Sequence, residues 1–172
     1  MTKFTDEHNS IITISSVGST QKKALFVLKN LAGKDLINLQ TGINAQINSE
    51  QKGKIISNAA LEKSESNGFN SKQHYAVAIN IEETWKKASI LVECPDNKGD
   101  INIKLIKRFE SLIILDNEPT IAYITVKESF QHGHRIYSLE LQEIKKVRWE
   151  GGRPITHTTP ANSDSVENEP YA

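Results

Sequence analysis

The chain has 172 residues, with 21 Lys and Arg against 21 Asp and Glu, so its formal net charge is zero. Hydrophobic residues make up 37 % and charged residues 24 %, which is typical of a globular protein and too apolar for a fully disordered chain. No apolar run exceeds five residues, which excludes a membrane span, and the single cysteine, Cys94, excludes an internal disulfide. We therefore expect the protein to be located in the cytoplasm.

The composition changes at both ends of the chain. Residues 149–172 are rich in Gly, Pro, Ser, Thr and Asn, hold almost no large apolar side chains and carry a net charge of −3. Such a segment buries too little apolar surface to offset its ordering entropy. We expect a flexible N-terminus at 1–10, a single domain at 11–148 and a flexible acidic tail or linker at 149–172.

In the first half, residues 11–15 predict a short strand. A helix comes next, capped by Ser19 or Thr20 and stopped near Gly33. Two short strands around a turn at 41–42 follow this helix, and residues 49–64 predict one or two short helices.

The strongest helical pattern covers residues 71–92, where apolar positions step by three and four residues up to Cys94-Pro95, which ends it. From Ile101 onward, three β-rich runs each alternate an apolar with a polar face. The predicted fold class is α+β, with N-terminal helices and a short hairpin followed by an antiparallel β-meander.

His74 lies one helical turn before the apolar stripe that starts at Ala78. A histidine at this position is a candidate acid or base near neutral pH, because its proton exchanges there. The alternative is a core-edge histidine with one satisfied hydrogen bond, and the bare sequence favours that interpretation.

Basic residues gather where the first two runs of the meander pair. Antiparallel pairing brings Arg108 close to Lys127, and two cations so placed would bind a phosphate. The alternative is a solvated strand end whose lysines discourage edge pairing. His132 and His134 flank a glycine turn without any grouped carboxylate or thiol, so we expect a solvated hairpin tip and no metal or cofactor.

Residues 36–144 resemble the phage-associated nuclease-like domains grouped as barnase–EndoU–colicin–RelE-like, which occur in large polyvalent proteins of phages and mobile elements. The matching blocks are INLQTGINAQI, SKQHYAVAINIEETWKKA, CPDNKGDINIKLIKRF, TIAYITVKES and RIYSLELQEI. The resemblance implies a ribonuclease-type fold and metal-independent RNA cleavage by attack of the ribose 2′-hydroxyl. The implied partners are RNA and a protein inhibitor, and delivery into a host cell is a further expectation.

The same resemblance implies roles for five residues. His74 would be the acid or base, Arg108 and Lys127 would be phosphate clamps, and Thr125 or Tyr137 would position or donate a proton. These groups would have to meet in one concavity.

The chain departs from the family pattern because no second histidine or buried glutamate stands in a matching block. Glu128 and His134 are the nearest substitutes. The alternative function is therefore a catalytically silent binding or accessory domain of a polyvalent phage protein, and a structural surface protein without a pocket is a second alternative.

Overall fold

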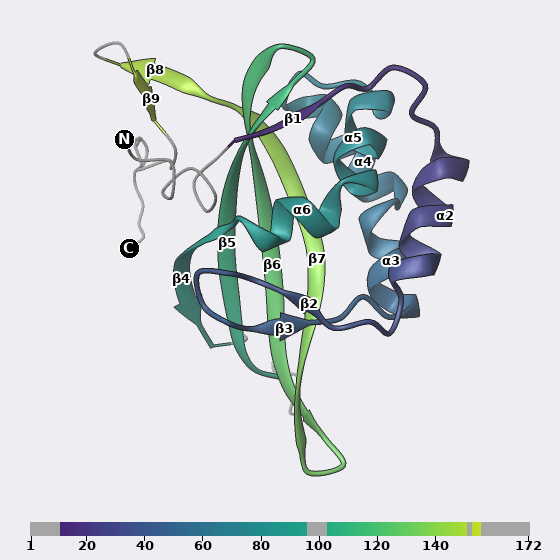
Figure 1. Cartoon of the computed structure of the whole chain (residues 1–172), viewed down its shortest axis with the longest axis vertical. Coiled ribbons are helices and arrows are strands. Elements are labelled where there is room, and N and C mark those ends of the chain that lie inside the picture. Colours follow the sequence, from purple (N-terminus) through teal and green to yellow (C-terminus); the bar gives the residue numbers. More distant parts are fainter. Residues whose placement is uncertain (1–10, 96–102, 151–152, 156–172) are drawn as a thin grey trace, which may run out of the picture.

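Residues 11–95, 103–150 and 153–155 are described by the structure, a computed structural model. In chain order its elements are β1 (Ile12–Ile14), α2 (Gln21–Leu31), β2 (Leu36–Ile37), β3 (Asn44–Ala45), α3 (Ser49–Ile55), α4 (Asn58–Ser66), α5 (Ser71–Ile79), α6 (Ile81–Lys86), β4 (Ser89–Cys94), β5 (Ile103–Leu115), β6 (Glu118–Gln131), β7 (His134–Lys146), β8 (Arg148–Glu150) and β9 (Arg153–Ile155). Helices α2 to α5 gather on one side of the long strands, and α6 crosses in front of them (Figure 1). The predicted α+β class is confirmed.

Polar caps begin several of the helices. The Thr20 hydroxyl accepts a hydrogen bond from a backbone N–H in the first turn of α2. Asn48 and Asn70 begin α3 and α5, each in a capping box with a glutamine three residues later. Gly33, with φ +80°, follows the end of α2, as predicted from the sequence.

The expectation of one helix over residues 71–92 is wrong in its extent. The helical pattern divides at Asn80, whose side-chain amide donates to the carbonyl of Ala76 (2.8 Å), and helix α6 ends at Lys86. The predicted stripe Ala78, Ile81, Trp85, Ala88 and Val92 is buried as far as Ala88, but its last member, Val92, lies on strand β4 and is 49 % exposed. The next element is strand β4, because its backbone pairs with β5 instead of continuing the helix.

The predicted antiparallel meander β5–β6–β7 is confirmed. The sheet has five strands in the order β1-β5-β6-β7, with β4 also pairing with β5. Strand β1 runs parallel to β5, an arrangement that the sequence pattern did not predict. Both meander turns use two consecutive residues with positive φ, Asp116-Asn117 and His132-Gly133, which suits tight hairpins.

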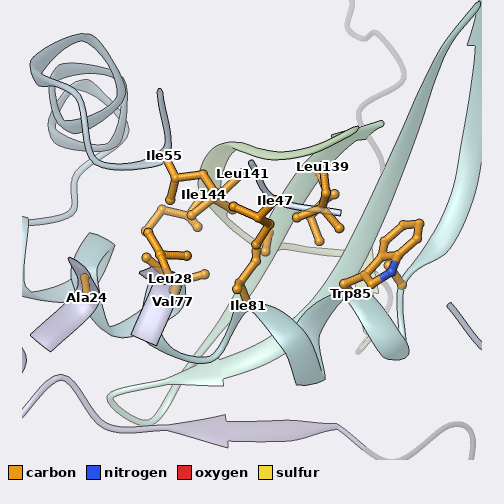
Figure 2. Packing of buried hydrophobic residues seen from close by; sticks show 14 of the residues in the cluster. Ala24, Leu28, Ile47, Ile55, Val77, Ile81, Trp85, Leu139, Leu141 and Ile144 are labelled. Carbon is orange, nitrogen blue, oxygen red and sulfur yellow. The ribbon is translucent and has the colours of Figure 1, made fainter. Parts of the chain in front are cut away.

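One face of the sheet and the helices share a single apolar cluster. Ala122, Ile124 and Val126 alternate along β6 and all belong to it, as predicted. Figure 2 shows side chains from the helices, the segment before α3 and strand β7 meeting in this cluster, among them Leu28, Ile47, Ile55, Val77, Ile81, Leu139, Leu141 and Ile144. The rings of Trp85 and Phe109 pack edge to face with centroids 4.8 Å apart, which joins α6 to β5.

Two short strands lie at the start of the segment expected to be a flexible tail, and that expectation stays a prediction. Residues 148–150 and 153–155 pair as the antiparallel strands β8 and β9. The predictions for 1–10 and for the tail beyond 155 lie outside the described residues. Within the described part of the chain, no helix is long and apolar enough to cross a membrane.

One buried amide helps to fix the β2–β3 hairpin to the rest of the fold. Asn38 has no exposed surface, and its Nδ2 donates to the carbonyls of Trp85 (2.8 Å) and Ala88 (2.9 Å). Its Oδ1 accepts from the backbone N–H (2.9 Å) and the hydroxyl (2.8 Å) of Thr41. Every donor and acceptor site of this amide is therefore used.

We predict that Asn38→Ala lowers the free energy of unfolding by about 3 kcal/mol, because it removes the four hydrogen bonds of a buried amide, including the side-chain donor to the Ala88 carbonyl. Urea denaturation measures this change. The matched control is Asn44→Ala, an exposed residue of the same hairpin, which should change stability by less than about 0.5 kcal/mol. Equal effects of the two substitutions would contradict the role given to Asn38.

Candidate functional site

His74 lies on α5 with no exposed surface. Its Nε2 is 2.7 Å from the carbonyl oxygen of Ile55, and its Nδ1 is 2.7 Å from the hydroxyl of Ser64. Because a carbonyl only accepts, Nε2 carries the proton and Nδ1 accepts from the serine. The ring thus joins α5 to α4 and to the end of α3.

The surroundings of His74 keep it neutral. Burial lowers the pKa of His74, and the hydrogen bond to the Ile55 carbonyl opposes this effect only in part. With both ring nitrogens bonded and no exposed surface, the imidazole has no atom available to a ligand. The core-edge interpretation of His74 matches this arrangement.

Arg108 and Thr125 lie on the sheet face that points away from the helices. They are direct partners across β5 and β6, and their neighbours Phe109 and Ile124 face the helices. The Arg108 guanidinium donates to the side-chain oxygen of Gln142 (2.9 Å), and the Thr125 hydroxyl donates to the same oxygen (2.9 Å). A polar group of three side chains therefore crosses β5, β6 and β7.

Lys127 lies on the same face, two residues after Thr125, so in the strand register it is diagonal to Arg108. Its ammonium lies 3.6 Å from a carboxylate oxygen of Glu140. Lys54 on α3 approaches that oxygen at 3.4 Å. The charge of Lys127 is thus balanced by a half-buried ion pair.

The predicted meeting of His74 with Arg108 and Lys127 in one concavity is wrong. His74 is enclosed among the helices, and the two cations extend from the opposite face of the sheet. The physical reason is strand alternation: the residues that flank Phe109 and Val126 must point away from the layer that contains His74.

Tyr137, the fifth predicted site residue, lines a groove of 380 Å³ between the β2–β3 hairpin and β7. The lining residues are Asp35, Thr41, Gly42, Ile43, Asn44, Gln46, Arg135, Ile136 and Tyr137. A volume of this size falls in the range of small-ligand sites. Among the described residues, this groove is the candidate functional site.

Gln46 forms the closed end of the groove. Its backbone N–H donates to the carbonyl of Tyr137 (2.8 Å), and its carbonyl accepts from the N–H of Leu139 (2.9 Å). From Gln46 back toward Thr41, the hairpin and β7 enclose the groove instead of pairing. The sequence predicted the hairpin but held no signal for this contact, since it joins segments about 90 residues apart.

A row of alternating charges leads across the sheet to the groove. Glu93 pairs with Lys107, whose ammonium is 3.8 Å from Glu128, and Glu128 in turn lies 3.1 Å from Nε of Arg135. The side chains of Lys107 and Glu128 are only 10 % and 8 % exposed, whereas that of Arg135 is 55 % exposed. The buried residues Lys107 and Glu128 therefore position the accessible guanidinium of Arg135 at the groove.

Metal ligands do not cluster in the described part of the chain, where no group of three or more His, Cys, Asp or Glu is arranged to hold an ion. His132 and His134 flank the turn between β6 and β7, both exposed, as expected for a hairpin tip.

We predict that His74 makes the stability of the fold depend on pH. Its folded pKa is below the ordinary value of 6.5, so the unfolded chain takes up a proton first as the pH falls through that value. The free energy of unfolding should then fall, by at most about 1.4 kcal/mol per pH unit, until the folded pKa is reached. Urea denaturation between pH 7.5 and 5 measures this slope.

The variant to compare with the wild type is His74→Gln. Its free energy of unfolding at pH 7.5 should be lower by about 2 kcal/mol and should change less steeply with pH. His134→Gln, at the exposed tip, should keep the wild-type slope. Parallel curves for the wild type and His74→Gln would show that another group is responsible.

The comparisons with known proteins concern the helices, the hairpin and most of the sheet. The family described as Large polyvalent protein-associated domain 3 matches residues 16–137, a range that includes the groove up to Tyr137. No curated protein and no solved structure matches the chain. Because the match covers most of the sequence, the chain belongs to the family of large polyvalent protein-associated domain 3.

Proposed function

We propose that this chain is a non-catalytic binding domain of a large polyvalent protein and that it binds its partner in the groove between the β2–β3 hairpin and β7. The groove is the observation that carries this proposal. One wall is fixed by the buried Asn38 amide, and the other belongs to the central meander, so the site is formed before any ligand arrives.

The bonding of the predicted catalytic residues supports a binding role over a nuclease role. His74 uses both ring nitrogens within the core. Arg108 is bonded to Gln142, and Lys127 is paired with Glu140. General acid–base catalysis needs a group within hydrogen-bond reach of the substrate, and His74 has no exposed surface for such contact.

RNA cleavage by a ribonuclease-like toxin domain is the second candidate function. The observation that favours it is the shared sheet face of Arg108, Thr125 and Lys127, because two cations two residues apart in register suit neighbouring phosphates. On this alternative a cognate protein inhibitor would be the partner, and the acid and base would have to be residues other than His74.

A cleavage assay decides between the two functions. We predict that the full chain, incubated in EDTA with end-labelled RNA of mixed sequence, leaves that RNA intact on a denaturing gel. The parallel sample is the double variant Arg108→Gln, Lys127→Gln, purified in the same way so that contaminating ribonuclease appears equally in both.

Cleavage by the wild type that falls at least about a hundredfold in the folded double variant would overturn the binding proposal and establish the ribonuclease. Equal background in both samples supports the binding domain. Circular dichroism of each protein verifies that the comparison is between folded chains.

A further inference from the structure

The hairpin wall of the groove offers main-chain hydrogen-bonding groups. Along a β-strand, the N–H and C=O of one residue point to the same side, and successive residues alternate. Gln46 directs both groups to β7, so Asn44, two residues earlier, directs its N–H and C=O the same way, into the groove. The Ile43 carbonyl accepts from the N–H of Asn38, which follows β2, so by alternation the groups of Asn44 point away from β2, and no described backbone hydrogen bond outside the sheet ladders uses them.

The β7 wall offers the same kind of groups. The Tyr137 carbonyl accepts from Gln46, so the Tyr137 N–H also faces the hairpin, and the N–H and C=O of Arg135 do so by alternation. These three groups therefore point away from β6, and among the described residues no backbone hydrogen bond outside the sheet ladders uses them. The groove is therefore a place where two strands separate and leave donors and acceptors on both sides.

Arg135 adds a charge to this wall. Its Nε faces the buried carboxylate of Glu128 (3.1 Å), and its guanidinium carbon lies 5.3 Å from the centre of the Phe130 ring. The terminal nitrogens have no partner among the described residues, so their N–H groups remain available to a ligand. Because Glu128 and Phe130 already orient the guanidinium, ligand binding costs little additional entropy of the Arg135 side chain.

We propose that the groove binds a short extended segment of a partner polypeptide, which pairs with β7 through its main chain and places a carboxylate side chain against Arg135. This inference rests on the proposed function and specifies its ligand. The peptide would add a strand to an exposed sheet edge, a general mode of peptide recognition. Its carboxylate would accept two charge-assisted hydrogen bonds from the guanidinium.

The chemistry of the walls favours a peptide over a nucleic acid. A nucleic acid would meet Arg135 through its phosphates, which have only acceptors, so this contact would leave the carbonyls of Asn44 and Arg135 without donors. Asp35 lies on the same groove and repels a polyanion. A peptide backbone supplies both donors and acceptors, and one acidic side chain is enough for Arg135.

The test uses the full chain and two libraries of synthetic decapeptides, one with a fixed central glutamate and random flanks, the other with glutamine in its place. We predict that the protein enriches peptides from the glutamate library only. Fluorescence anisotropy of one enriched peptide should show affinity reduced about tenfold to a hundredfold in Arg135→Gln. Lys29→Gln, an exposed charge on α2, should leave affinity unchanged.

Main-chain pairing is tested on the peptide itself, which avoids any question of protein folding. Replacing single amide N–H groups of the enriched peptide by N-methyl groups should weaken binding about fivefold or more at alternate positions and little at the positions between. Uniform sensitivity, or none, would refute strand addition.

Four other results would overturn the inference. No enrichment by a protein that leaves RNA intact would refute the peptide ligand while the proposed binding function stands, whereas RNA cleavage dependent on Arg108 and Lys127 would refute that function. Binding of a mixed-sequence RNA dodecamer with the same Arg135 dependence would assign the groove to nucleic acid. Peptide binding that appears only after residues 156–172 are deleted would assign it to the chain's own C-terminal segment.

Discussion

The four hydrogen bonds of the Asn38 side chain are the constraint on which the groove depends. Two of them tie a hairpin with strands of only two residues each to the carbonyls of Trp85 and Ala88 at the end of α6, and the other two hold the hairpin's own turn at Thr41. The indole N–H of Trp85 supports the same attachment by donating to the Leu36 carbonyl (2.7 Å). With the hairpin fixed, Gln46 meets β7, and the open wedge next to this contact is the site.

Local patterns allowed most elements to be predicted, and non-local pairing explains where the predictions failed. The alternation in β6 and the helical stripe through Ile81 and Trp85 correctly identified buried faces. The stripe continues through Ala88, however, and the helix does not, because the Asn38 amide binds the carbonyls at its end and β5 pairs with the residues after it. Asn38 and β5 both lie outside residues 71–92, the segment whose pattern predicted the helix.

The candidate site was harder to predict for a related reason. Residue type identified His74 as a proton carrier and Arg108 and Lys127 as phosphate ligands, but side-chain direction decides whether such groups meet. A single step along a strand reverses that direction, and only the pairing of β5 with β6 shows which residues share a face. Tyr137 does line the groove, although the sequence suggested it as a proton donor, and Arg135 was missed because its role depends on Glu128 behind it.

The row of alternating charges gives the groove a preference for acidic ligands that its main-chain groups alone do not provide. From Glu93 through Lys107 and Glu128 to Arg135 the sign alternates, so each buried charge lies between opposite neighbours. Arg135 ends the row with an opposite charge on one side only, and a ligand carboxylate would continue the alternation there. Main-chain pairing accepts many sequences, whereas this terminal charge selects those with an acid at one position. A binding domain built in this way recognises a short motif and tolerates variation around it.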